Sequence, residues 1–133
     1  MKLITFSDGG ARGNPGPAAY GVVIKDADSK LLKQHGRYIG HTTNNQAEYR
    51  GLVDALEHAK DMGATEVACF LDSELLVKQM KGEYRVKDPE LAKLYVRVHN
   101  LMIQIGKVSF THVRRELNKE ADAMVNKALD EHH

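Results

Sequence analysis

Alternation of apolar and polar residues predicts a strand at the start of the chain. Ile4 and Phe6 alternate with Thr5 and Ser7, which is the two-residue period of a strand with two distinct faces. Asp8 continues the parity of Ile4 and Phe6. A carboxylate is therefore expected where the apolar face of this strand ends.

The residues after this strand are typical of a turn. Four glycines and two prolines fall within residues 9–17, which favours a bare backbone that a ligand can approach closely. A strand that ends in an acid and opens into such a turn can hold a metal or a phosphate. The alternative is an ordinary surface turn in which Asp8 only accepts hydrogen bonds from the turn's own N–H groups.

Similar patterns along the rest of the chain predict four more strands and four helices. The gaps between the first three strands are short, which favours antiparallel hairpins. Strands then alternate with helices, which favours parallel pairing. We therefore expect an α/β fold with a five-stranded mixed sheet, three antiparallel strands followed by two parallel ones, flanked by helices. At 133 residues the chain has the length of a single domain, 1–133.

The boundaries of the expected elements follow from local signals. Gly63 is expected to end the first helix, Pro89 to begin the third and Asn118 to cap the last. The later strands are expected at 20–25, 31–39, 67–71 and 108–113, and the helices at 45–62, 73–80, 89–105 and 118–130.

Three further acids stand where apolar stripes end. Asp72 ends the fourth strand as Asp8 ends the first, whereas Glu48 and Asp122 each lie above the apolar stripe of a helix. The local alternatives are turn capping for the strand acids and interaction with the helix dipole for the helix acids. Because the first and fourth strands should lie side by side and parallel, their carboxyl ends mark the crevice where such sheets bind ligands.

Four carboxylates that converge at one place would repel each other and resist ionisation. A divalent cation removes that conflict. Oxygen ligands without cysteine or histidine indicate Mg²⁺, or Mn²⁺ as the alternative, rather than zinc. With four acids, two ions about 3.5–4 Å apart become plausible, which is the arrangement used for in-line phosphoryl displacement.

Composition limits the class of protein. The apolar share of 42% and the charged share of 28% indicate a globular chain, and no apolar run or signal-peptide core indicates a membrane or an export route. The single Cys69 is expected to be a buried thiol in a reducing compartment, hence the cytoplasm. A net charge of +1 does not indicate nucleic-acid binding, which must depend on local arrangement. His132 and His133 are given no role.

Four segments of the chain resemble the signature segments of the type 1 ribonuclease H family. They are FSDGGARGNPGP, TTNNQAEYRG, FLDSELLV and NKEADAMV, in the family's order and spread over nearly the whole chain. The resemblance implies a ribonuclease H-like fold and hydrolysis of the RNA strand of RNA–DNA hybrids. It places the family's four catalytic, metal-binding carboxylates at Asp8, Glu48, Asp72 and Asp122, and its substrate-binding positions at Gly9, Asn14, Thr43, Asn44 and Asn45.

Asparagine and threonine suit these substrate positions. An amide can accept a hydrogen bond from a 2′-OH and donate one to a base edge or a phosphate. The alternative is that these residues cap the helix and form the turn before it, and Asn44 or Asn45 could serve both purposes.

The chain departs from the family's pattern in two places. The family often carries a basic, tryptophan-bearing helix and loop where this chain has only a short connector at 81–88 and no tryptophan. It also often has a loop histidine before its last helix, where this chain has Arg114 and Arg115. Arg115 is expected to be the freer of the two to reach the site as a fixed cation. His112 belongs to the last strand by parity.

The expected activity is a metal-dependent endonucleolytic hydrolysis of the RNA strand of RNA–DNA hybrids, which leaves 5′-phosphate and 3′-hydroxyl ends. The protein is expected to be a monomer that binds RNA–DNA hybrid and does not associate with a membrane. Two alternatives stay open from the sequence. One is a nucleic-acid-binding module of the same fold with little catalysis, and the other is a related two-metal DNA nuclease or integrase.

Overall fold

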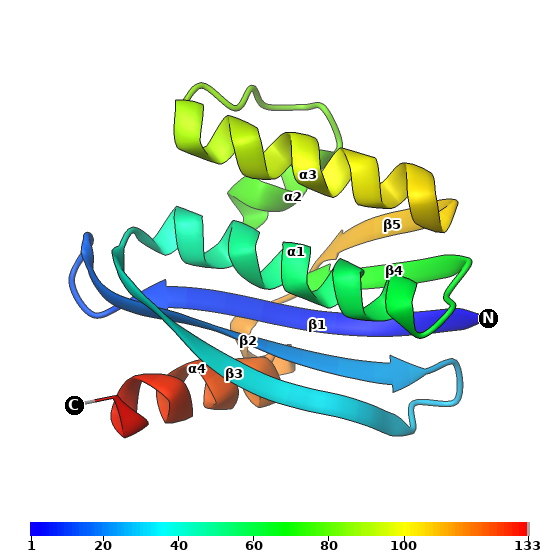
Figure 1. Ribbon diagram of the computed structural model, residues 1–133, viewed down its shortest axis with the longest axis horizontal. Helices are drawn as coiled ribbons and strands as arrows, with labels where there is room; N and C mark the ends of the chain where they lie inside the picture. The colour runs from blue at the N-terminus through cyan, green and yellow to red at the C-terminus, as the bar shows by residue number, and fades with distance from the viewer. Residues whose placement is uncertain (133) are drawn as a thin grey trace.

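The computed structural model describes residues 1–132 and contains one mixed sheet with helices on both faces (Figure 1). The order of the five strands across the sheet is β3-β2-β1-β4-β5. β1 pairs antiparallel with β2, and β2 with β3, whereas the β1–β4 and β4–β5 pairs are parallel. The predicted fold class is confirmed. The strands are β1 (Lys2–Ala11), β2 (Gly16–Asp26), β3 (Leu31–Thr42), β4 (Glu66–Leu71) and β5 (Lys107–His112).

The helices are divided between the two faces of the sheet. α1 lies across one face against β1 and carries α3 on its outer side, whereas α4 packs on the opposite face against β2 and β3 (Figure 1). No helix within residues 1–132 is long and apolar enough to cross a membrane. The helices are α1 (Asn44–Asp61), α2 (Glu74–Met80), α3 (Pro89–Ile105) and α4 (Lys119–Glu131), with a 3₁₀ turn, η1 (Arg115–Leu117), before the last.

Local signals account for most helix ends. Gly63 follows α1 with a φ of +89°, a left-handed conformation that glycine adopts without a steric penalty. Ser73 caps α2 and Asp88 caps α3, with Pro89 in the first turn of α3 as predicted. All four predicted helices are present within one residue of their expected bounds.

The predicted turn at 9–17 is wrong at both ends. β1 continues through two glycines to Ala11 and β2 begins at Gly16, so the connection shrinks to residues 12–15. A Cβ at Gly9 would lie 2.3 Å from the carbonyl carbon of Ala47, because the backbone of α1 passes directly over the strand. At Gly9 the bare backbone therefore allows the close approach of α1.

The polar face of β1 is more buried than its apolar face, which is the reverse of what polarity predicts. Thr5 and Ser7 are fully buried beneath α1 although both are polar, whereas Phe6 on the other face is only half-buried. Phe6 stacks on Phe70 of β4 with ring centroids 5.2 Å apart. Asp8 follows the Phe6 face as predicted, but this is the less buried face of the strand because α1 covers the opposite one.

The start of α4 is held differently from the prediction. Asn118 occupies the N-cap position, but its side chain makes no capping hydrogen bond. Its amide nitrogen Nδ2 instead donates to the carbonyl oxygen of Ser7 at 2.9 Å. The contact is buried and joins the first turn of α4 to β1, directly before Asp8.

Cys69 lies in β4 with 1% of its surface exposed. Burial raises the pKa of its thiol to about 12. The predicted buried, free thiol is confirmed.

Candidate active site

Acidic side chains from separate elements meet at one end of the sheet. Asp8 lies on β1 directly after the last residue that pairs with β4, Asp72 directly follows β4 and Glu48 lies in the second turn of α1. One carboxylate oxygen from each of these three residues lies within 4.8 Å of the other two. Asp122, in the first turn of α4, lines the same cavity of about 360 Å³. The structure thus brings the four predicted acids together.

The acids are placed there by the packing of their elements. Glu48 begins the stripe of α1 that continues into the fully buried Leu52 and Ala55. Asp122 stands above Val125 and Leu129, which face the sheet from α4. Because the apolar part of each stripe is buried, its acidic first member is held at the end of the sheet.

The cluster carries more negative charge than its surroundings compensate. Burial, reinforced by the negative charge of Asp72, raises the pKa of Asp8 to about 7. Burial and the charge of Asp8 raise the pKa of Glu48 well above its usual range. Within residues 1–132, the buried oxygen Oε2 of Glu48 has no hydrogen-bond partner. An unpartnered oxygen beside other carboxylates fits a cation between them.

The donor set also indicates which cation fits. Among the described residues, the lining of this cavity includes carboxylates and asparagine amides but no cysteine or histidine. Such oxygen donors favour Mg²⁺ or Mn²⁺ over softer transition metals. The residues present therefore fit the predicted kind of metal.

The uncompensated charge predicts that Glu48→Gln stabilises the metal-free protein. Because folding raises the pKa of Glu48, the wild type loses stability as pH rises from the pKa of glutamate in the unfolded chain toward the pKa of Glu48 in the folded protein. The gain should be small near pH 4 and reach on the order of 1–3 kcal/mol near pH 8, the usual cost of leaving a buried polar group without a partner. Urea unfolding in a chelator across this pH range measures it. An equal gain at both ends of the range would contradict the electrostatic cause.

The predicted substrate residues form the junction between the β1–β2 connection and α1. The side-chain oxygen Oδ1 of Asn44 accepts from the backbone N–H of Ala11 at 2.7 Å, and the backbone N–H of Asn44 donates to Oδ1 of Asn14 at 3.0 Å. Thr43 caps α1 by accepting from the N–H of Gln46 at 3.2 Å. The alternative of a helix cap is therefore confirmed for Thr43, which occupies the N-cap position, and is wrong for Asn44 and Asn45.

The predicted substrate residues differ in whether they line the cavity that contains the acids. Gly9, Asn44 and Asn45 line the acidic cavity, and both asparagines are exposed. Asn14 and Thr43 are not part of its lining, and each makes a structural hydrogen bond instead. The structure thus brings Gly9, Asn44 and Asn45 to the cavity of the acids, whereas Asn14 and Thr43 lie outside its lining.

Asn126 is a cavity residue that the sequence reasoning missed. Its amide nitrogen Nδ2 lies 3.3 Å from Oδ2 of Asp122 and 3.2 Å from the backbone oxygen of the same residue. Spacing could have found it, because a residue four positions after Asp122 lies on the same face of a helix. Ser73 and Arg12 also line the cavity without having been predicted.

Within residues 1–132, Arg115 is the one lysine or arginine that lies within 4 Å of a carboxylate oxygen of the four acids. Its Nε lies 3.9 Å from Oδ2 of Asp72, and 84% of its side chain is exposed. It begins η1 and lines the cavity, which Arg114 does not. His112 ends the edge strand β5, which its parity predicted, and it is exposed.

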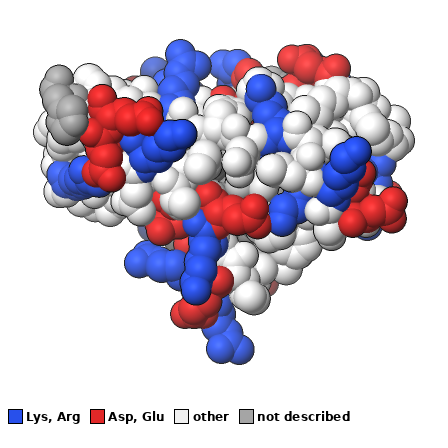
Figure 2. Space-filling view, turned by 90° about the horizontal axis from the view of Figure 1, so that it is seen from below, with Lys and Arg blue, Asp and Glu red and all other residues white. Residues whose placement is uncertain are grey.

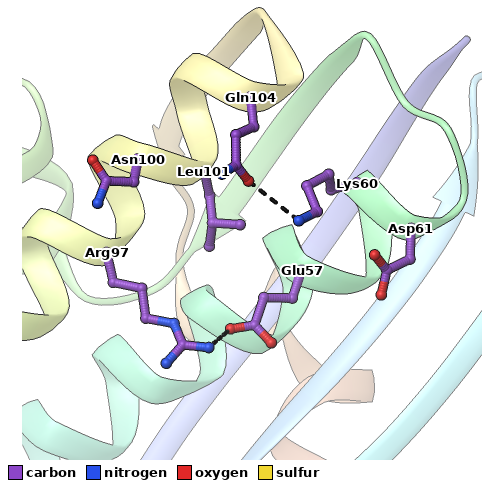
Figure 3. A pocket seen from close by; sticks show the side chains of 7 residues that line it. All are labelled: Glu57, Lys60, Asp61, Arg97, Asn100, Leu101 and Gln104. Atoms are coloured by element: carbon purple, nitrogen blue, oxygen red, sulfur yellow. Dashed lines mark hydrogen bonds and ion pairs between the residues drawn. The ribbon is translucent and has the colours of Figure 1, made fainter.

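A second cavity of about 330 Å³ lies between α1 and α3 (Figure 3). Arg97 there forms an ion pair with Glu57, and Nζ of Lys60 donates to the side-chain oxygen of Gln104 at 3.2 Å. Three of its charged groups are thus already engaged with neighbours. The cavity at the end of the sheet, where like charges converge, is the better candidate for a reaction.

The surface charge is mixed on the face that carries α4. Figure 2 shows lysine and arginine side chains interspersed with aspartate and glutamate on this face. This agrees with the net charge of +1. Any attraction of a polyanion has to come from particular groups around the cavity rather than from a uniformly basic surface.

Comparison with known proteins identifies the family. The family model described as "Reverse transcriptase-like" matches residues 6–128. The Bifunctional protein Rv2228c of Mycobacterium tuberculosis is 47% identical over 131 residues, which are 98% of this chain and 36% of that protein. The Ribonuclease HI of Halobacterium salinarum is 44% identical over 130 residues, 98% of this chain and 65% of that protein. The chain therefore spans about a third to two-thirds of the length of these relatives.

Solved structures agree with this assignment. The N-terminal RNase H domain of Rv2228c superposes with a TM-score of 0.95 at 46% identity, covering 98% of this chain and 94% of that one. The LC11-RNase H1 structure in complex with an RNA/DNA hybrid has a TM-score of 0.92 at 44% identity, with 96% of each chain covered. Together with the four converging acids, these similarities show that the chain belongs to the type 1 ribonuclease H family.

Proposed function

We propose that this protein hydrolyses the RNA strand of RNA–DNA hybrids endonucleolytically and leaves 5′-phosphate and 3′-hydroxyl ends. The observation that carries the proposal is the cluster of Asp8, Glu48 and Asp72, whose carboxylate oxygens lie within 4.8 Å of one another at the open end of the sheet. Support comes from the 44% identity to LC11-RNase H1, whose structure holds an RNA/DNA hybrid. The chain matches only 36% of the length of Rv2228c. The proposal therefore concerns residues 1–133 as one catalytic domain.

Asp8, Glu48 and Asp72 would hold divalent metal, Mg²⁺ or Mn²⁺, and Asp122 would complete a second of two positions. When bound, the metal supplies a water of lowered pKa and positive charge beside the scissile phosphate. Asn126 orients Asp122 by donating a hydrogen bond to its carboxylate, which can also accept a hydrogen bond from a water molecule. Oε2 of Glu48 has no hydrogen-bond partner among the described residues and would act as a ligand.

Asn44 and Asn45 would distinguish RNA from DNA. Both are exposed in the first turn of α1, where backbone N–H groups and the positive end of the helix dipole favour phosphate. The Oδ1 of Asn44 is occupied by Ala11, which leaves its Nδ2 as the group free to donate. Asn45 offers both an acceptor for a 2′-OH and a donor.

Arg115→Ala should lower kcat more than it raises KM. The exposed pair with Asp72 adds little to stability, so its removal should leave the fold intact. An arginine stays protonated throughout and can only act as a fixed cation, which matters most when negative charge grows on the phosphate. We expect a loss of kcat of about tenfold to a hundredfold. Steady-state kinetics on a short hybrid measures it, with Arg114→Ala as the matched control, and equal effects of the two variants would contradict the assignment.

We also propose that the protein is a monomer and that it is located in the cytoplasm. The buried free thiol of Cys69 is compatible with a reducing compartment. Sedimentation analysis at micromolar concentration tests the monomer.

The experiment that tests the function compares three labelled duplexes of one sequence: RNA–DNA hybrid, RNA duplex and DNA duplex. With Mg²⁺ we expect cleavage of the RNA strand of the hybrid and none of the DNA duplex, a 5′-phosphate on each downstream product and no cleavage in a chelator. Glu48→Gln serves as the control for contaminating nuclease. Cleavage of the DNA duplex would favour a DNA nuclease, and binding of hybrid without cleavage would favour a binding module.

A further inference from the structure

Two histidines and an aspartate meet at the contact between α1 and β3. The Nε2 atom of His35, from β3, lies 2.8 Å from Oδ1 of Asp54 on α1. The Nε2 atom of His58, one helical turn after Asp54, lies 3.2 Å from the same oxygen. One ligand atom from each residue lies within 4.8 Å of the other two. Two imidazole nitrogens thus converge on one carboxylate oxygen.

The other oxygen of this carboxylate is already held. The hydroxyl of Tyr20, on β2, donates to Oδ2 of Asp54 at 2.5 Å. A carboxylate ligand in a metal site is commonly oriented in this way, with one oxygen toward the ion and the other toward a hydrogen-bond donor. Asp54 is therefore fixed with Oδ1 directed at the two histidines.

The cluster is open enough for an ion to enter. The side chains of His35, Asp54 and His58 are 26%, 14% and 36% exposed. Asp54 and His58 follow each other by four residues on one face of α1, so the helix fixes their separation. Two protein nitrogens and one oxygen leave at least one coordination position for water, as in three-ligand sites for Zn²⁺.

This cluster is separate from the acidic one in place and in chemistry. Asp54 and His58 lie six and ten residues beyond Glu48 on α1, which is about 9–15 Å along the helix axis. Imidazole nitrogen prefers late first-row metals such as Zn²⁺, Ni²⁺ and Cu²⁺, whereas the acidic cluster offers only oxygen. Mg²⁺ is not expected to compete here.

We propose that His35, Asp54 and His58 form a second metal site that takes a late first-row transition ion such as Zn²⁺ and joins β3 to α1. Within residues 1–132, the buried Nδ1 of His35 has no hydrogen-bond partner. A ring that binds metal through Nε2 carries its proton on Nδ1, and tight sites provide an acceptor for it. The affinity is therefore expected to be micromolar rather than nanomolar. Bound Zn²⁺ should stabilise the fold by linkage.

The test is calorimetric titration of Zn²⁺ into the Glu48→Gln protein in excess Mg²⁺, which keeps Zn²⁺ from the acidic cluster. We expect one ion per chain with micromolar affinity and a rise in melting temperature. His58→Ala added to this protein should weaken binding at least about tenfold, and Tyr20→Phe by about tenfold through loss of carboxylate orientation. His112→Ala, on the edge strand, should change nothing.

His58→Ala should fold, because the position is partly exposed on a helix and alanine favours helix; circular dichroism verifies this. Lack of saturable binding at up to 1 mM Zn²⁺, roughly a thousandfold above the low end of the micromolar range, would overturn the proposal. Equal affinity in the His58→Ala protein would also overturn it, because the ion would then be held by other histidines such as those at the end of the chain.

Discussion

Asp8→Asn, Glu48→Gln and Asp72→Asn are each expected to reduce cleavage of an RNA–DNA hybrid by roughly 10³-fold or more while the protein stays folded. Their oxygens form one cluster within 4.8 Å, so loss of a single negative charge removes a ligand from the whole arrangement. The substituted amides keep the volume of the acids. Repulsion within the cluster decreases, so the loss of activity cannot come from unfolding.

Single-turnover cleavage with saturating Mg²⁺, together with circular dichroism, measures this effect. Asp122→Asn should be milder, because Asp122 lies outside the group of three and an amide can still orient a water molecule. Asp61→Asn, at the exposed end of α1, is the matched control for loss of one negative charge. Retention of more than about a tenth of the activity in any of the first three would remove that residue from the proposed machinery.

The sequence predicts this site because each acid interrupts a pattern that burial imposes. Glu48 and Asp122 stand at the top of helical stripes whose lower members are fully or almost fully buried. Asp8 and Asp72 each follow the last paired residues, Ser7 and Leu71, of two parallel strands, so their positions side by side follow from topology. Periodicity reports burial, and burial sets the direction of a side chain. Such residues can be located without coordinates.

Hydrogen-bond partners cannot be located in the same way. Asn118 has a residue type suited to an N-cap, yet its amide is bound to the Ser7 carbonyl from the other end of the chain. Asn44 likewise accepts from Ala11 rather than capping α1. A polar side chain bonds with whatever group the fold brings within reach, and sequence separation hides that group.

The same limit explains why His35 was not connected with Asp54. The four-residue spacing of Asp54 and His58 is visible in the sequence, but the third member comes from β3. Its position depends on how α1 crosses the sheet, which local pattern does not specify. Sites assembled from one element and a distant strand therefore emerge only in the structure.

Gly9→Ala is expected to damage both the fold and the site. Its Cβ would lie 2.3 Å from the carbonyl carbon of Ala47 and 2.4 Å from the backbone nitrogen of Glu48. Backbone atoms inside a helix cannot rotate away as a side chain can, so α1 must move off β1. Overpacking of this kind typically costs about 1–3 kcal/mol. A displacement of Glu48 by about 1 Å can lower the cleavage rate about a hundredfold.

Gly10→Ala is the control that separates this cause from any general need for glycine. A Cβ at Gly10 would have only one neighbour within 4 Å, the Asn44 side-chain oxygen at 3.9 Å. Gly10 lies in β1 and pairs with Ala19 of β2, and alanine is tolerated in a strand, so its substitution should change stability by less than about 0.5 kcal/mol. Urea unfolding and single-turnover cleavage of both variants measure the contrast. If Gly9→Ala were as stable and as active as Gly10→Ala, the close approach of α1 to β1 would not be what positions Glu48.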